Sequence, residues 1–363
     1  MPDQSPITTV RSARRFRAPK ELGIFSVLIL VVLVFSVLSP NFRTYGNASS
    51  LLLNGSVIGF LTLGQMLVLL TGGIDLSTGA IVAMCGVLSA IVMSHGAPWW
   101  LAVLATLAIG ALTGVINGVL IYYGHIPAFI VTFAMMGVAT AIPLILTGAA
   151  SVTVDDATFS IIGQGRVFTI PVPVFLLVLV ALAVATILSK TKFGVHTYAM
   201  GGSAAAARLA GVNIGRNTVV IYALSGLFAA VGGLILTSRL MVGFPSAGLG
   251  NQLFYSIAGA VVGGVSLFGG VGTVAGAMIG ATLIATVTNG LNVLNVNSYW
   301  QSLVIGVIIL VGVFFDVNGS RLAGSSLAIW LRSIFRSSSH RGAVGGDETA
   351  SNAEEKVVSR NVS

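Results

Sequence analysis

The fold is decided by residues 190–216, KTKFGVHTYAMGGSAAAARLAGVNIGR, a long interior segment that cannot sit in a membrane. Its basic side chains are Lys190, Lys192, Arg208 and Arg216, and no acid offsets them. Lys and Arg resist translocation, so a loop of this composition is expected on the cytoplasmic side of a membrane. The apolar sequence on both sides of the loop is then expected to cross that membrane repeatedly.

Within this loop, residues 203–211 predict a short helix. Ser203 can cap its first amides, four consecutive alanines favour the helix, and Gly211 can end it in the left-handed conformation. A helix of about two turns is marginal in water, so a stable one needs a surface on which to dock. The sequence contains no soluble domain to supply that surface, and we expect it to belong to a partner.

The composition points to the same class of protein. Hydrophobic residues make up 55% of the 363-residue chain and charged residues 8%, and there are 45 glycines. Such a chain is far too apolar for a water-soluble globule, and we predict an all-α polytopic membrane protein. The net charge of +8 lies in tails and one loop rather than along a folded face, so we expect no nucleic-acid partner.

Charge-poor runs near the length that a bilayer requires predict about ten transmembrane helices. They are residues 22–39, 51–70, 76–94, 98–120, 127–147, 171–189, 217–238, 252–267, 271–294 and 299–315. The first run is longer than the apolar region of a usual signal peptide, which favours a span. An even count puts both termini on the cytoplasmic side with the 190–216 loop, and only Arg43, Arg166 and Arg239 of 18 Lys and Arg residues fall outside.

These runs divide the chain into three parts. Residues 1–21 are expected to form a basic cytoplasmic tail, and residues 22–318 a transmembrane domain that includes the cytoplasmic loop 190–216. Residues 319–363 are expected to form a second cytoplasmic tail, disordered at its Ser-rich and polar end. The loop 149–170 is expected outside.

Two similar glycine motifs are expected to break neighbouring helices. TGGIDLSTG at residues 71–79 and FGGVGTVAG at residues 268–276 align Gly72 and Gly73 with Gly269 and Gly270. Glycine pairs permit positive φ and close helix approach, and repeated helix breaks often mark a transport site. The alternative is that small residues are simply common in membrane helices.

Asp75 is the one acid surrounded by apolar sequence. An ionisable group at membrane depth is a functional candidate, and in an ion-coupled carrier it would bind a proton or sodium ion. If the turn lies at the cytoplasmic surface, Asp75 is a helix cap beside Ser77. The cap interpretation is favoured because it needs no buried charge.

Three asparagines lie within apolar spans and are candidates for the solute path. Asn289 and Asn292 are three residues apart and share a helix face, and Asn117 lies in an earlier span. We assign Phe129 to the same path. The asparagines could equally bond neighbouring helices, which is the commoner role.

The four histidines have no metal-ligand spacing and the chain has no phosphate-binding loop, so we expect no metal site, no cofactor and no enzyme activity.

From about Leu22 to Asp316 the chain resembles the ribose and related monosaccharide permease subunits of bacterial ABC importers. The resemblance is carried by GQMLVLLTGGIDLSTGAIVA, GVINGVLIYYGHIPAFIVTFAMM, TKFGVHTYAMGGSAAAARLAGVNI and GAVVGGVSLFGGVGTVAGAMIGATLIATVTNGLNVLNVNSYWQ, in this order. It implies a ten-span subunit of the bacterial inner membrane that pairs with a second copy. It also implies a separate ATPase, which uses ATP and Mg²⁺, and a sugar-binding protein outside.

The resemblance also assigns a role to the central loop, as the segment that couples the ATPase to the spans. The matching positions are Gly202, Ala205, Arg208, Leu209 and Gly211. Ala204 stands where the family often has an acid, which weakens the case for an ion pair with the ATPase there. Shape and apolar contact can still carry the docking. An ion-coupled secondary carrier that uses Asp75 is the alternative function, and a passive channel is a third.

Overall fold

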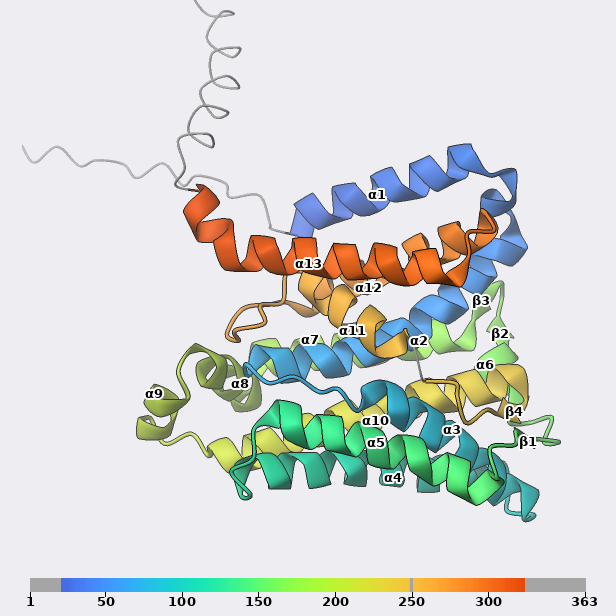
Figure 1. The fold of residues 1–363 in the computed structure, drawn as a ribbon, viewed down its shortest axis with the longest axis horizontal. Coiled ribbons are helices and arrows are strands. Elements are labelled where there is room, and N and C mark those ends of the chain that lie inside the picture. Colours follow the sequence, from blue (N-terminus) through green and yellow to red (C-terminus); the bar gives the residue numbers. More distant parts are fainter. Residues whose placement is uncertain (1–20, 249–250, 324–363) are drawn as a thin grey trace, which may run out of the picture. The chain divides into compact units, whose positions relative to one another are not determined.

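The computed structural model describes residues 21–248 and 251–323, so most of the predicted tails, at residues 1–21 and 319–363, lies outside the described residues. Most of the described residues are helical (Figure 1). The longer helices are α1 (Glu21–Leu38), α2 (Tyr45–Leu70), α3 (Thr78–Ser94), α4 (Trp99–Tyr122), α5 (Ala128–Thr147), α7 (Val172–Lys190), α8 (Lys192–Gly202), α10 (Ile214–Leu240), α11 (Gln252–Val262), α12 (Val274–Val293) and α13 (Ser298–Ala323). Residues up to Gly312 form one compact unit, and α13 continues beyond it.

Short elements fill the connections. They are the 3₁₀ helix η1 (Pro40–Arg43), the helices α6 (Ser160–Gln164) and α9 (Ala204–Leu209), and the strands β1 (Val152–Thr153), β2 (Arg166–Val167), β3 (Ile170–Pro171) and β4 (Val242–Gly243). The strands form two antiparallel pairs, β1 with β4 and β2 with β3. The first pair joins the loop before α7 to the end of α10.

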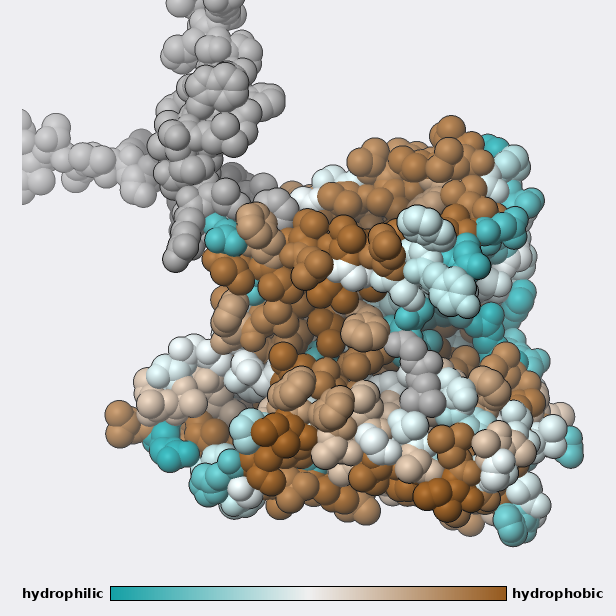
Figure 2. All heavy atoms as spheres, viewed as in Figure 1, coloured by the Kyte–Doolittle hydropathy of each residue, from teal (hydrophilic) through white to brown (hydrophobic). Residues whose placement is uncertain are grey.

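The centre of the compact unit is formed by α2, α10 and α12. In the most apolar 18 residues of these helices 72%, 61% and 67% are buried, against 22% in α5 and in α7. The outer helices expose large aliphatic side chains such as Val37, Ile145 and Leu179, and Figure 2 shows apolar residues over much of the visible face. Such a surface suits lipid tails rather than water. The prediction of an all-α polytopic membrane protein is confirmed.

Within residues 21–248 and 251–323, ten apolar helices correspond to the ten predicted spans, and eight of them have 18 residues or more and are long and apolar enough to cross a membrane. The expected span at residues 252–267 is wrong in length, because α11 has 11 residues and ends at Val262. At 1.5 Å per residue it covers about half of a 30 Å hydrocarbon core. Gly264, with φ of 84°, ends the helical path. The other short helix, α3, has 17 residues.

The two long interior loops lie at opposite ends of α2 (Figure 1). At its beginning, Tyr45 donates its hydroxyl to the carbonyl of Thr169 at 2.8 Å and accepts from Arg166 at 3.0 Å. At its end, Leu70 meets the segment around α8 and α9. This helix has 26 residues and is about 39 Å long. Loops at its two ends are therefore far enough apart for one to be external and the other cytoplasmic, as predicted.

Candidate functional site

Asp75 lies in the break between α2 and α3 and is fully buried. One carboxylate oxygen accepts from the backbone N–H of Ser77 at 2.9 Å and from its hydroxyl at 2.6 Å, and the other accepts from Ser225 of α10 at 2.7 Å. Asn117 of α4 donates to the Ser77 hydroxyl at 3.0 Å. The network therefore joins the break to α4 and α10.

This geometry keeps the cap contact expected for Asp75 and corrects the expectation that its carboxyl would not be buried. The carboxylate does hold the N–H of Ser77, which precedes α3, as a cap would. It does so at 0% exposure, inside the packed helices. A buried carboxyl is costly unless hydrogen bonds replace its water, and three donors from Ser77 and Ser225 supply them here. The sequence could not show this, because Ser225 is 150 residues away.

The predicted path residues do not converge on one cavity. Asn289 and Asn47 of α2 exchange hydrogen bonds between their side-chain amides at 3.0 Å and 2.9 Å. Asn292 accepts from Gln301 of α13 at 2.8 Å. With Asn117 bonded to Ser77, all three asparagines bond neighbouring segments, which was the alternative interpretation.

Phe129 lies elsewhere, in a crevice where the start of α3, the first half of α5 and the start of α11 meet. It is 59% exposed, and its ring stacks on that of Phe133 with centroids 6.0 Å apart. The crevice has a volume of about 370 Å³ and is lined by Leu76, Gly79, Ala80, Phe129, Phe133, Met136, Gly248, Leu253 and Phe254. Exposed aromatic faces beside a helix break can pack against the apolar face of a sugar ring.

The glycine motifs lie in the breaks after α2 and before α12, and the two breaks touch. Gly270 donates its N–H to the carbonyl of Leu70 at 2.9 Å. Gly72, Gly269 and Gly270 have positive φ, at 77°, 89° and 73°, which glycine adopts without strain. Gly201 of α8 closes the junction, since a Cβ added there would collide with the carbonyl of Leu70 and the N–H of Gly270.

A tyrosine adds a second contact between α8 and the same break. Tyr198 donates its hydroxyl to the carbonyl of Gly272 at 2.9 Å. Burial raises the pKa of this hydroxyl above its ordinary value, so the donor stays protonated at neutral pH. The loop that carries the predicted coupling segment is thus bonded to the break before α12.

The predicted short helix is α9, which runs from Ala204 to Leu209. Ser203 accepts from the N–H of Ala206 at 3.2 Å, and Gly211 follows with φ of 83°. The expectation that this chain supplies no docking surface is wrong. Ala207 is 4% exposed and packs with Met200 and Ile214, and α8, which we did not predict, carries Met200.

The opposite face of α9 remains open. Ala204, Ala205 and Arg208 are exposed, and Leu209 is 91% exposed. Arg208 reaches the hydroxyl of Tyr122 at 3.5 Å, at the end of α4. A helix anchored on one side and apolar on the other presents a small surface to another protein.

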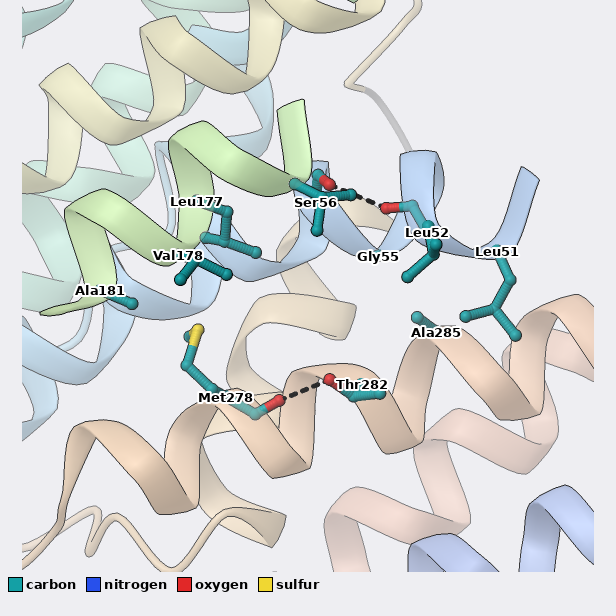
Figure 3. A pocket seen from close by; sticks show the side chains of 11 residues that line it. Leu51, Leu52, Gly55, Ser56, Leu177, Val178, Ala181, Met278, Thr282 and Ala285 are labelled. Atoms are coloured by element: carbon teal, nitrogen blue, oxygen red, sulfur yellow. Dashed lines mark hydrogen bonds between the residues drawn. The ribbon is translucent and has the colours of Figure 1, made fainter. Parts of the chain in front are cut away.

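A cavity of about 200 Å³ between α2, α7 and α12 was not anticipated (Figure 3). Leu177 and Val178 of α7 and Met278 of α12 are among its lining residues. Its two hydroxyls bond their own helices, Ser56 to the carbonyl of Leu52 and Thr282 to that of Met278, both at 2.8 Å. Neither hydroxyl hydrogen is left to recognise a sugar.

The sequence profile of one protein family, described as the permease component of the branched-chain amino acid transport system, matches residues 47–313. The chain belongs to this family. The permease is also 38% identical over 301 residues to the ribose import permease protein RbsC of Escherichia coli K12, covering 82% of the permease and 93% of that relative. No solved structure matches the permease.

Two further relatives are similar to the permease over most of both chains. RbsC of Bacillus subtilis is 40% identical over 299 residues, covering 82% of the permease and 92% of the relative. The L-arabinose transport system permease protein AraH of Escherichia coli K12 is 37% identical over 295 residues, covering 81% and 89%. The family is one of transport permeases, not of enzymes, and the matches favour this class over an ion-coupled carrier.

Proposed function

We propose that the permease is the transmembrane subunit of an ATP-driven ABC importer and carries a monosaccharide such as ribose. The observation that carries the proposal is the identity of 38–40% to ribose permeases over four fifths of the chain. The arabinose relative supports the monosaccharide class. A bacterial cytoplasmic membrane is the location that such an importer requires.

In this proposal a separate ATPase binds ATP and Mg²⁺ and docks on α9. The exposed side of α9 supports this role, because Ala204, Ala205 and Leu209 offer shape and apolar contact without a charge. Arg208 can meet an acid of the ATPase. No phosphate-binding loop occurs in the chain, so the nucleotide chemistry belongs to the partner.

Movement of α9 would pass to the spans through α8. Gly201 contacts the backbone of Leu70 and Gly270 without any side chain between them. Such a contact between backbone atoms transmits a displacement of α8 directly, because there is no side chain that could change its rotamer and absorb the movement. A push on α9 would therefore shift the end of α2 and the break before α12 together, with Tyr198 as a second link.

We place the sugar path along the crevice that contains Phe129. A second copy of the permease would cover the exposed rings of Phe129, Phe133 and Phe254 and complete the path. An extracytoplasmic binding protein would deliver the sugar at the end of α2 that carries Tyr45. The buried Asp75 network supports the wall of the path, where it joins the break at Leu76 to α10.

Uptake in cells tests this function. Deleting the gene should abolish uptake of radiolabelled ribose at low external concentration, and a plasmid copy should restore it. Unlabelled monosaccharides should compete with the label, while leucine should not. Loss of leucine uptake with sugar uptake intact would instead support an amino acid permease, as the family description reads.

A further inference from the structure

A basic pocket lies where α8 meets the beginning of α10. Its volume is about 430 Å³, and its lining residues are Lys192, Phe193, His196, Gly211, Asn213, Arg216, Asn217 and Val220. Lys192 and Arg216 are exposed and charged, and none of these lining residues is acidic. The pocket therefore favours an anion.

Two features beyond net charge strengthen this preference. Asn217 is 8% exposed, and its side-chain N–H₂ has no hydrogen-bond partner among the described residues. A buried donor without a partner is costly, so a ligand that accepts from it gains affinity. The first turn of the 27-residue helix α10 lies in the same wall, where Asn213 caps the N–H of Arg216, and the helix dipole adds partial positive charge. Phosphate oxygens suit both features.

An apolar crevice adjoins this pocket and lies along α7 and α10. Its volume is about 180 Å³, and it is lined by Leu67, Val180, Ala183, Val184, Ile187, Leu188, Phe193, Leu224 and Phe228, all of them apolar. Phe193 lines both cavities. Val220, Leu224 and Phe228 follow each other at steps of four residues, so they share one face of α10 and lead from the basic pocket into the crevice.

We propose that the two cavities form one site for an anionic phospholipid of the cytoplasmic leaflet. Its phosphate lies against Lys192, Arg216 and Asn217, and an acyl chain lies between α7 and α10. From Leu188 to Val180 the crevice follows α7 for about 12 Å, a depth that a chain reaches and a headgroup does not. Basic pockets between transmembrane helices on the cytoplasmic side bind such headgroups.

The crevice is the reason to choose a lipid over other anions. A soluble phosphate compound or a carboxylate of the ATPase would use the basic pocket and leave the apolar crevice unfilled. The site lies where α8 meets α10, the helices that precede and follow α9 in the chain. A bound lipid would brace the segment that receives the ATPase, a role beyond the transport function proposed above.

Lipid retention measures the headgroup contacts. The permease is placed in nanodiscs of phosphatidylcholine with a small fraction of phosphatidylglycerol, and native mass spectrometry after release counts the phosphatidylglycerol that stays bound. Each basic side chain near the headgroup raises the affinity for the lipid about fivefold, so the K192Q/R216Q double variant should bind phosphatidylglycerol roughly 25-fold more weakly. Lys190→Gln, a nearby charge outside the pocket, is the control and should change binding by about twofold at most.

The acyl contacts need their own variant. Ala183→Phe fills the crevice from an exposed position of α7 and leaves the basic pocket intact, so it should also expel the lipid. Unchanged retention in both variants would overturn the proposal. If glycerol phosphate displaces the lipid and Ala183→Phe has no effect, the site takes a free phosphate, and the proposal is wrong. If K192Q/R216Q loses ATPase binding alone, the pocket is a protein contact, and the proposal is again wrong.

Discussion

Gly270 donates its backbone N–H to the carbonyl oxygen of Leu70 at 2.9 Å, which joins the break before α12 to the last turn of α2. Gly201 of α8 lies against both groups. Two breaks almost 200 residues apart in the sequence thus share one contact with the loop that carries α9. This junction is the structural basis of the coupling that we propose.

Gly201→Val tests the junction. Its Cβ would meet the carbonyl of Leu70 and the N–H of Gly270, so α8 must move away. Overpacking of this kind costs about 1–3 kcal/mol, and we expect a lower thermal midpoint together with ATP hydrolysis that no longer drives uptake. Gly137→Val, at an exposed position of α5 outside the loop, is the control, because a Cβ at Gly137 has no atom within 4 Å. Normal coupling in Gly201→Val would contradict the proposed role of the junction.

Asp75 is tested by comparing Asp75→Asn with Asp75→Leu. Asn keeps one carbonyl oxygen for Ser77, and its amide can donate to the hydroxyl of Ser225, so transport should persist with a loss of about 0.5–1.5 kcal/mol in unfolding free energy. Leu leaves the donors unpaired and should cost about 1–3 kcal/mol for each buried group.

The measurements are thermal unfolding of the purified protein and uptake in vesicles. Asp155→Asn, at an exposed loop position, controls for the change of charge and should lie within about 0.5 kcal/mol of the wild type. Abolished transport in a stably folded Asp75→Asn protein would revive an ionic role for this carboxyl.

Much of the fold follows from the sequence because apolar runs of bilayer length are a strong signal. Eight of the ten predicted spans are helices of sufficient length. The two shorter helices are α3, with 17 residues, and α11 in the predicted span at residues 252–267, where hydropathy cannot distinguish a spanning helix from a half-length helix followed by a turn. That turn is tolerated because protein groups satisfy its backbone, as when the N–H of Val265 donates to Ala260 and the N–H of Ser266 to Val271.

The site was less predictable, since its contacts are between residues far apart in the chain. The cap at Ser203 and the left-handed Gly211 are local features, and both were predicted correctly. The partners of Asp75 and Asn289 come from other helices, Ser225 and Asn47. Gly201 gave no signal of its own, because nothing in the sequence tells a glycine at a close backbone contact from one in open space.

Ala205→Trp tests the docking surface of α9. Ala205 is exposed and touches no span, so the variant should insert and fold normally but fail to bind the ATPase or uncouple hydrolysis from uptake. Pull-down of the ATPase and the thermal midpoint distinguish these effects. Ala207→Trp provides the contrast, because Ala207 is buried against Met200 and Ile214 and its replacement should destabilise the loop itself.

Arg208→Ala on the same helix should cost only about 0.3–1 kcal/mol of local stability through the helix dipole. If Ala205→Trp binds the ATPase and transports at the normal rate, α9 is only a connector between α8 and α10.

Cysteine labelling tests the orientation. The native Cys85 is fully buried and should not react, so the wild type is the background control. Cysteine in place of Leu209 should label only from the cytoplasm, and cysteine in place of Thr158 only from outside, because basic loops stay inside. The reverse pattern, read with a membrane-impermeant maleimide on cells and on inverted vesicles, would reject the predicted topology.

The most direct test of the account is the energy source for uptake. The permease is reconstituted in proteoliposomes with its ATPase and sugar-binding protein, and radiolabelled ribose uptake is measured with ATP or with an imposed proton or sodium gradient. We predict uptake with ATP alone, no response to either gradient, and no ATP hydrolysis by the pure permease without its partner. Uptake that follows an ion gradient without ATP, or hydrolysis by the pure permease, would contradict the account.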